Sequence, residues 1–207
     1  MLSYSRPWCR ARNAVCLLLV LAAAGAAQAA EKARLHVDDY QIAVELLPET
    51  HHLNAHAVVK VTALEDLSLI TFQLNNALRI TKLTDANGKP LTPERVTQDS
   101  SIRFGLNSSL TKGTTTTFTF DYEGTLENSD DSPVQGLKLA YVGPDTSYLL
   151  YSGLWFPVSG YGANRFTSTI SVTVPAHMIA IGSGNDATPV PAPFAKKTEV
   201  ASTKTFT

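Results

Sequence analysis

Three histidines lie close together in the sequence and are the first candidates for chemistry, because imidazole is a common metal ligand and proton carrier. On a helix, His52 and His56 would share one face, with His51 beside them. The alternation of polar and apolar residues around them predicts a strand instead, in which four residues span about 13 Å. Two imidazoles that each lie about 2 Å from a zinc ion cannot bridge that distance. We therefore expect solvent-facing histidines in a turn and a strand, and no metal site.

An acidic run at residues 128–131, Asn-Ser-Asp-Asp, offers oxygen ligands of the kind that calcium prefers. The run lacks the spaced ligands, central glycine and distal glutamate of an EF-hand loop, so it is interpreted as a solvated loop. The sequence contains no G-x-S-x-G, Walker A, G-x-G-x-x-G or H-E-x-x-H motif. It therefore predicts no catalytic residue in this chain.

The charge argues against a nucleic-acid partner. The 207 residues carry 17 Lys and Arg against 18 Asp and Glu, a formal net charge of -1. Arg6, Arg10 and Arg12 are the basic residues among the first 30, which leaves 14 basic against 18 acidic side chains, or -4, beyond them. A polyanion needs a basic surface to bind, so we expect neither nucleic-acid nor anionic-membrane binding.

Residues 1–29 are typical of a cleaved signal peptide. A basic start precedes the apolar run Ala14–Ala24, and Ala27-Gln28-Ala29 follows with the small-x-small pattern of a cleavage site. Eleven apolar residues are too few to span a bilayer, which needs about 20. We predict cleavage after Ala29, a mature domain of residues 30–207 without a membrane anchor, and a periplasmic or secreted location. Cys9 and Cys16 leave with the signal, so the mature chain has no disulfide.

The mature sequence alternates apolar and polar residues with the period of a β-strand, and long stretches of helical period are missing. Turn signals separate the alternating runs, the strongest being Asn87-Gly88. Strands recurring at this spacing predict an all-β fold, either an antiparallel β-sandwich or a saddle-shaped sheet. The predicted strands cover residues 40–46, 53–63, 70–74, 102–106, 118–122, 170–174 and 178–181.

Several motifs follow one another in a recognisable order. An Ala/Val-rich return strand leads to Phe-x-Leu-Asn, Asn-Gly-Lys-Pro, and Lys-Gly before a strand that ends in Tyr-x-Gly, at residues 54–64, 72–75, 87–90 and 112–124. The most specific stretch is Trp155-Phe156-Pro157, then Arg165, a strand ending in Val-Pro at residues 174–175, and a segment ending in Gly-Ser-Gly at residues 182–184. Over most of the mature chain, this order resembles the β-rich first domain of aminopeptidase N-like zinc metallopeptidases.

The resemblance implies a parent enzyme that removes N-terminal residues from peptides with the help of zinc. In that family, the Gly-x-Met-x-Asn loop and the H-E-x-x-H zinc ligands lie in a following catalytic domain, and neither motif is present here. The sequence stops in the β-like run Lys204–Thr207. We therefore expect a fragment or truncated product that holds no zinc, with its own catalytic domain as the missing partner.

The resemblance also implies two roles for residues 148–157. Family members often hold the free amine of the substrate with a Gln or Glu just before the aromatic-Pro pair; here only Tyr151 or Ser152 can stand in, and the alternative for Tyr151 is sheet packing. The segment is too apolar for one strand face to bury. Trp155 and Phe156 are therefore candidates for docking on the catalytic domain, the alternative for Trp155 being a core position. Val158-Ser159-Gly160-Tyr161-Gly162 stands where many family members have Cys-x-Asp-x-Pro, which indicates a divergent branch.

A second function from a different class is a stand-alone exported β-sandwich that binds carbohydrate or a protein. The absence of a catalytic constellation from the sequence favours it. A coding sequence for H-E-x-x-H beyond Thr207 would distinguish the metallopeptidase domain from this binding module.

Overall fold

A computed structural model describes residues 33–128, 132–160, 165–185 and 203–206. The predicted signal peptide (1–29) and its cleavage site lie outside these residues, as does most of the acidic run. The described residues belong to one compact unit, Ala33–Thr207. No helix among them is long and apolar enough to cross a membrane.

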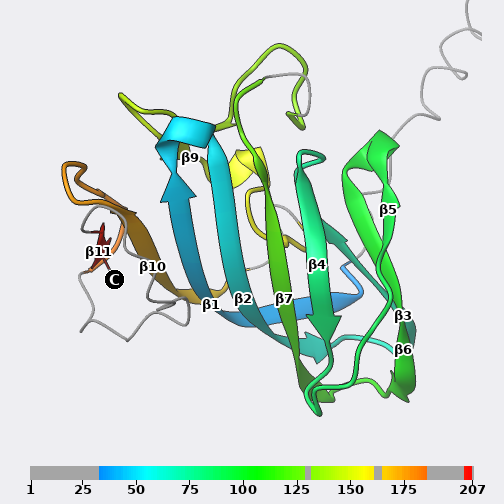
Figure 1. Ribbon diagram of the computed structural model, residues 1–207. Helices are drawn as coiled ribbons and strands as arrows, with labels where there is room; N and C mark the ends of the chain where they lie inside the picture. Colours follow the sequence, from blue (N-terminus) through cyan, green and yellow to red (C-terminus); the bar gives the residue numbers. More distant parts are fainter. Residues whose placement is uncertain (1–32, 129–131, 161–164, 186–202, 207) are drawn as a thin grey trace, which may run out of the picture. The chain divides into compact units, whose positions relative to one another are not determined.

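The larger sheet is mixed, with β1 and β2 as a long hairpin near its middle (Figure 1). The order among the described strands is β11-β10-β1-β2-β7-β4, and each neighbouring pair is antiparallel except β1 and β10, which are parallel. The prediction of a β fold rich in antiparallel pairs is confirmed, whereas a purely antiparallel sheet is wrong at β10. The strands are β1 (Leu35–Leu47), β2 (His52–Ala63), β4 (Leu78–Thr84), β7 (Thr115–Thr125), β10 (Thr167–Pro175) and β11 (Thr203–Phe206).

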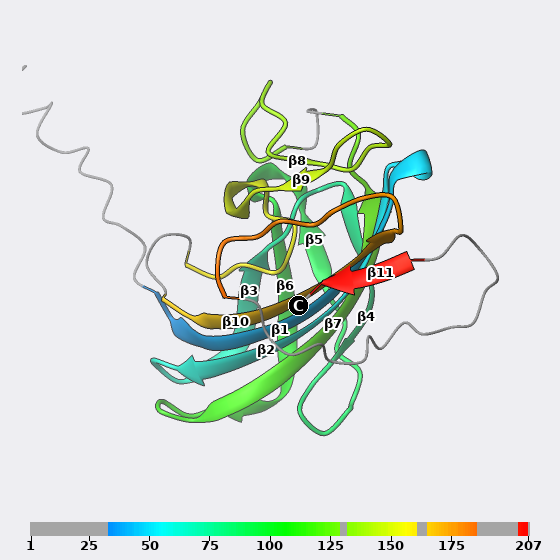
Figure 2. The same ribbon diagram turned by 90° about the vertical axis from the view of Figure 1, so that its left-hand side faces the viewer.

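A smaller sheet packs against the larger one through phenylalanines. Phe72 and Phe104 of the smaller sheet meet Phe120 and Phe118 of β7 edge to face, with ring centroids 5.4 and 5.3 Å apart. Such pairs add to the free energy gained by burying the rings. The two sheets enclose one core (Figure 2), which fits the β-rich fold predicted as either a sandwich or a saddle-shaped sheet. The smaller sheet has the order β3-β6-β5 in the described chain, with β3 (Leu67–Gln73), β5 (Glu94–Val96) and β6 (Ser101–Leu110).

The buried faces follow the sequence alternation. In β1 the inward residues run from Tyr40 to Leu46 at every second position, and β2 buries every second residue from Leu53 to Ala63. A bulge between Val37 and Asp39 shifts the phase of β1, so that Val37 and Tyr40 both face the core. The pattern of apolar residues therefore fixes which face of each strand is buried.

Short 3-10 turns and a two-stranded hairpin complete the described structure. The turns η1 (Pro48–Thr50), η2 (Thr97–Asp99) and η3 (Tyr151–Gly153) are each followed by a left-handed residue, which is His51, Ser100 or Leu154. The predicted turn between β1 and β2 is thus a 3-10 turn closed by His51. The hairpin pairs β8 (Ala140–Tyr141) with β9 (Tyr148–Leu149).

The predicted strand at residues 178–181 is wrong. The chain turns after β10, where the Met178 amide donates to the Pro175 carbonyl over 3.0 Å. Ile179 and Ile181 are then 76% and 94% exposed. The neighbouring position along β10 is occupied by β11, which pairs with residues 172–175, so that edge of β10 is not available to the following segment.

Candidate functional site

The segment from β9 to Val158 carries the residues singled out by the sequence, and it is bonded tightly to the end of β3. Val158 donates to and accepts from the backbone of Gln73, with N–O distances of 2.8 and 2.6 Å. The Asn75 amide donates to the Leu154 carbonyl over 2.8 Å. These bonds fix η3 and the aromatic residues after it against the smaller sheet.

Asn75 joins the turn before β4 to η3, a role that no catalytic motif signals. Its buried side-chain amide donates to the Gly153 carbonyl over 3.0 Å, and its Oδ1 accepts from the Ala77 amide at 2.9 Å. The half-buried guanidinium of Arg95 donates to the carbonyls of Leu74 and Leu78 on either side, and burial lowers its pKa. Asn75 is the last residue of the Phe-x-Leu-Asn motif. A polar amide directly after an apolar strand is the sequence feature that could have pointed to this structural role.

Trp155 and Phe156 are buried inside this chain, being 5% and 4% exposed. Their rings meet edge to face at 4.8 Å, and Phe156 packs on Tyr40 at 5.1 Å. This burial is what the core alternative for Trp155 predicts. The exposed apolar side chains of the same segment are Tyr148 and Leu150.

Tyr151 and Ser152 lie in η3 and are half-buried. The Tyr151 ring packs against Phe156 and Phe166, with centroids 5.8 and 6.0 Å away. Next to it, the Tyr40 hydroxyl donates to the Pro157 carbonyl over 2.8 Å. Burial, followed by the nearby Tyr151, raises the pKa of Tyr40 far above its ordinary value, so this phenol is a neutral hydrogen-bond donor. Neither Tyr151 nor Ser152 supplies the negative charge of the family's Glu.

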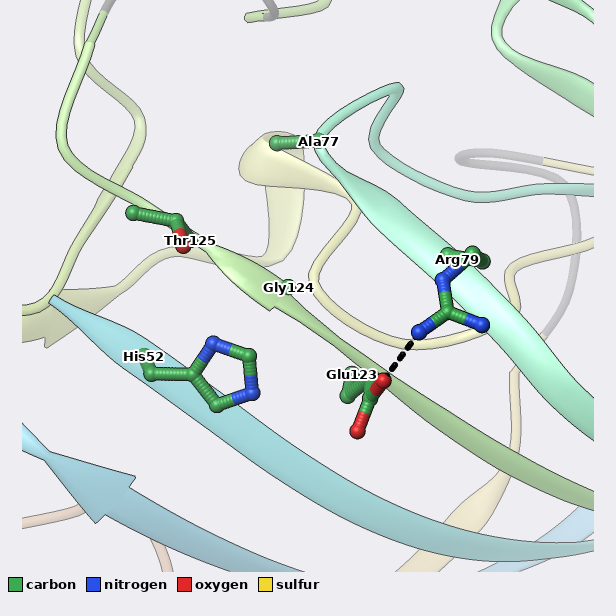
Figure 3. Close-up of a pocket in the computed structure, with 6 residues that line it drawn as sticks. All are labelled: His52, Ala77, Arg79, Glu123, Gly124 and Thr125. Atoms are coloured by element: carbon green, nitrogen blue, oxygen red, sulfur yellow. Dashed lines mark hydrogen bonds and ion pairs between the residues drawn. The ribbon is translucent and has the colours of Figure 1, made fainter. Parts of the chain in front are cut away.

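The three candidate histidines face different partners. The His51 Nδ1 contacts the Val142 carbonyl at 2.6 Å, and the His56 Nδ1 lies 2.6 Å from Asp121 Oδ1 across β2 and β7. His52 lines a shallow cavity of about 360 Å³ beside the Arg79–Glu123 ion pair (Figure 3). In the described ranges, no three His, Asp or Glu side chains come together to hold a metal ion.

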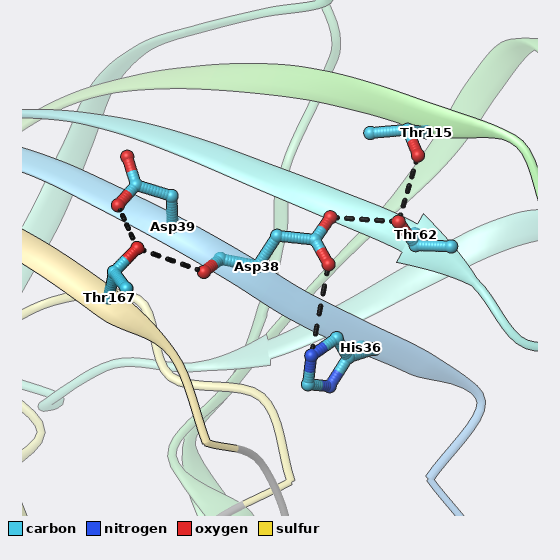
Figure 4. Close-up of polar contacts among 6 residues, drawn as sticks. All are labelled: His36, Asp38, Asp39, Thr62, Thr115 and Thr167. Atoms are coloured by element: carbon cyan, nitrogen blue, oxygen red, sulfur yellow. Dashed lines mark hydrogen bonds and ion pairs between the residues drawn. The ribbon is translucent and has the colours of Figure 1, made fainter.

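Two further carboxylates gather near the bulge of β1, where protein donors already bind them (Figure 4). Thr62 donates to Asp38 over 2.8 Å, and Thr167 donates to Asp39 from β10. His36 lies 3.7 Å from the other oxygen of Asp38. This cluster ties β1 to its two neighbouring strands and does not form an open site.

The fold matches solved metallopeptidase structures. The M1 zinc metallopeptidase from Deinococcus radiodurans is 23% identical with a TM-score of 0.66, and the match covers 86% of this chain and 39% of that one. A mutant of that enzyme bound to a Tyr-Ser-Ala substrate is 24% identical over the same shares, with a TM-score of 0.65. A two-domain M1 mutant bound to L-arginine is 24% identical over 83% of this chain and 38% of its own, with a TM-score of 0.63.

No family model matches the sequence, and no curated protein matches it. At these identities, the structural likeness establishes the fold. The chain has the same fold as one part of an M1, aminopeptidase N-like zinc metallopeptidase. It spans about two fifths of the length of those structures, 39% in the first. The likeness confirms the fold that the resemblance in the motifs implies.

Proposed function

We propose that this chain is the non-catalytic N-terminal domain of an exported aminopeptidase N-like zinc metallopeptidase. The observation that carries the proposal is the fold match, which covers 86% of this chain but only 39% of the metallopeptidase chain. In this proposal, residues 30–207 frame one side of a peptide cleft and dock on a catalytic domain whose motifs the printed sequence does not contain.

The zinc chemistry belongs to the catalytic domain in this proposal. A catalytic zinc held by protein ligands activates a water and polarises the peptide carbonyl. The contribution of this chain is to shape the cleft and to exclude water around the substrate.

Tyr151 and Ser152 are the proposed neighbours of the substrate's free amine. Both are half-buried, and both carry hydroxyl groups that can accept a hydrogen bond from an ammonium group. The turn η3 is held by Asn75 and by the pairing of Val158 with Gln73, so their positions are fixed before substrate binds.

Reconstitution tests the proposal. The catalytic segment is produced from the parent gene with zinc, and its hydrolysis of aminoacyl anilides is measured with and without residues 30–207. We expect residues 30–207 alone to hydrolyse no anilide. The catalytic segment mixed with residues 30–207 should hydrolyse the anilides at least tenfold faster than the catalytic segment alone. Equal activity with and without this chain would contradict a role in framing the cleft, and binding to carbohydrate instead would favour the stand-alone module.

The hydroxyl contacts are tested in the assembled enzyme with Tyr151→Phe and Ser152→Ala. A lost hydrogen bond is worth about 0.5–1.5 kcal/mol, so KM should rise about two- to tenfold with little change in kcat. Ser109→Ala, at an exposed position of β6 outside this segment, is the control and should leave KM unchanged. An unchanged KM in both variants would leave Tyr151 with a packing role alone.

A further inference from the structure

Four apolar side chains between residues 134 and 150 are exposed together. Val134, Leu137, Tyr148 and Leu150 have exposed fractions of 47%, 55%, 37% and 50%. We call these four side chains the hairpin patch, since they lie in β9 and the loops that flank the β8–β9 hairpin. Single exposed apolar residues are ordinary on a protein surface, whereas a group of them on one supersecondary unit marks an interaction site.

Backbone pairing brings the members of the patch together. Tyr148 lies opposite Tyr141 in the hairpin, with ring centroids 5.8 Å apart. The Leu150 amide donates to the Leu139 carbonyl over 3.0 Å, which places Leu150 beside the chain that carries Leu137. Leu137 in turn donates to the Val134 carbonyl over 3.2 Å.

The hairpin is anchored to the larger sheet. The Val142 amide donates to the Leu126 carbonyl just after β7 over 2.9 Å, and the Val142 carbonyl contacts the His51 Nδ1 at 2.6 Å. The His51 ring also lies 5.9 Å from Tyr141. A surface held in this way loses little conformational entropy when a partner covers it.

The patch is continuous with the segment proposed to border the substrate. A Cβ at Gly153 would lie 2.6 Å from the Leu139 carbonyl oxygen and 2.9 Å from the Ala140 Cβ, so η3 packs directly on the start of β8, between Leu137 and Tyr148 of the patch. Leu150 immediately precedes Tyr151 in the chain. A partner that covers Leu150 therefore reaches the edge of η3.

We propose that the hairpin patch is the surface on which the catalytic domain of the metallopeptidase docks. This inference rests on the proposed function, and the occupant follows from length: the matched structures extend well beyond the 39% that this chain covers. The Lys138 ammonium lies 4.9 Å from the Tyr141 ring centroid, at the edge of the patch. We therefore expect the complementary surface to be apolar and to place an acidic side chain opposite Lys138. In this proposal, the catalytic domain contacts the exposed residues of the hairpin patch and not the buried side chains of Trp155 and Phe156.

The test measures the affinity of the catalytic segment for this chain by calorimetry, with Leu137→Ser plus Leu150→Ser as the variant. A few buried anchor side chains carry most of the binding energy of an interface, and this variant replaces the two most exposed members of the patch with a polar residue, so it should bind at least tenfold more weakly. Leu64→Ser is the matched control: Leu64 is 39% exposed and follows the opposite end of β2 from His51. It should bind within twofold of the wild type.

Each outcome separates the two proposals. Thermal unfolding of the double variant should match that of the control, which shows that weaker binding is not a folding defect. If the double variant binds as tightly as the wild type, the patch is not the docking surface although the proposed function stands. If the wild-type chain does not bind the catalytic segment at all, the proposed function fails and this inference fails with it.

Discussion

Two buried tyrosines differ in what their hydroxyl groups bind. Tyr40 donates to the Pro157 carbonyl over 2.8 Å, whereas the Tyr122 hydroxyl is buried with no hydrogen-bond partner among the described residues. A buried polar group without a partner costs about 1–3 kcal/mol of stability. The same substitution at the two positions should therefore have opposite effects.

Removal of these hydroxyls tests that difference. Tyr122→Phe should raise the free energy of unfolding by about 1 kcal/mol or more, because it removes an unpaired polar group. Tyr40→Phe should lower it by about 1–2 kcal/mol, because the Pro157 carbonyl loses its donor. Urea unfolding of the three proteins gives both values. A loss of stability in Tyr122→Phe would show that its hydroxyl has a partner in solution.

Alkaline pH should destabilise the fold through the same two residues. Burial raises the pKa of Tyr40 and Tyr122 above the ordinary value near 10, so above that pH the unfolded chain releases protons that the folded chain keeps. Stability is then fully present below about pH 10 and falls above it by about 1.4 kcal/mol per pH unit for each tyrosine. The Tyr40→Phe/Tyr122→Phe double variant should have a flatter profile between pH 9 and 11. An identical slope in both proteins would contradict this origin.

At the scale of elements, the approach of β4 to β7 depends on one glycine. A Cβ at Gly124 would lie 2.1 Å from the Ala77 carbonyl oxygen and 3.1 Å from the Leu78 Cα. These are backbone atoms at the start of β4, so they cannot move aside without displacing the strand. The contact explains the glycine of the Tyr-x-Gly motif in physical terms.

Gly124→Ala should lower the free energy of unfolding by about 2–4 kcal/mol, in the range of overpacked sites. Gly105 in β6 is the matched control, because a Cβ there meets no atom within 4 Å and its φ is not positive. Gly105→Ala should change stability by less than about 1 kcal/mol. Denaturant unfolding compares the two, and equal effects would contradict the close approach as the cause.

The strand faces could be predicted from the sequence, because alternation decides which side chains are buried. The partner of each strand could not. β10 pairs parallel to β1 more than 120 residues earlier, as in Ile42 with Ile170, and no local pattern encodes that pairing. For the same reason, residues 178–181 have a strand-like sequence but no strand, since β11 occupies the edge of β10.

For the candidate site, the sequence predicts which segment matters but not which of its side chains are exposed. The stretch from Tyr148 to Phe156 is unusually rich in apolar residues, whereas its division into buried and exposed side chains depends on η3 and on the contacts of Asn75. Those contacts join residues 75 and 153, and sequence spacing does not reveal them.

At the scale of the whole molecule, the predicted signal peptide gives a testable start of the mature protein. If the leader is removed after Ala29, as its small-x-small pattern predicts, the mature chain begins with Ala30 and carries no cysteine. N-terminal sequencing of the exported protein checks the cleavage site. Recovery of intact Met1 on a membrane-bound product would contradict the signal-peptide interpretation.

If the proposed function holds, the catalytic motifs lie in a domain outside the printed sequence. The matched metallopeptidase chains are longer than this one, which covers 39% of the first. A shared fold at 24% identity requires only that apolar residues stay at the buried positions. It does not require the residues of an active site, so the fold by itself does not indicate peptidase activity.

Sequencing the gene past the codon for Thr207 is the decisive test of the proposed role as the first domain of a metallopeptidase. We predict a coding segment with Gly-x-Met-x-Asn followed by H-E-x-x-H and a third zinc ligand, either in the same frame or after a single disrupting mutation. A stop codon at that position in intact relatives, with no such motif downstream, would contradict this role and favour a stand-alone binding module.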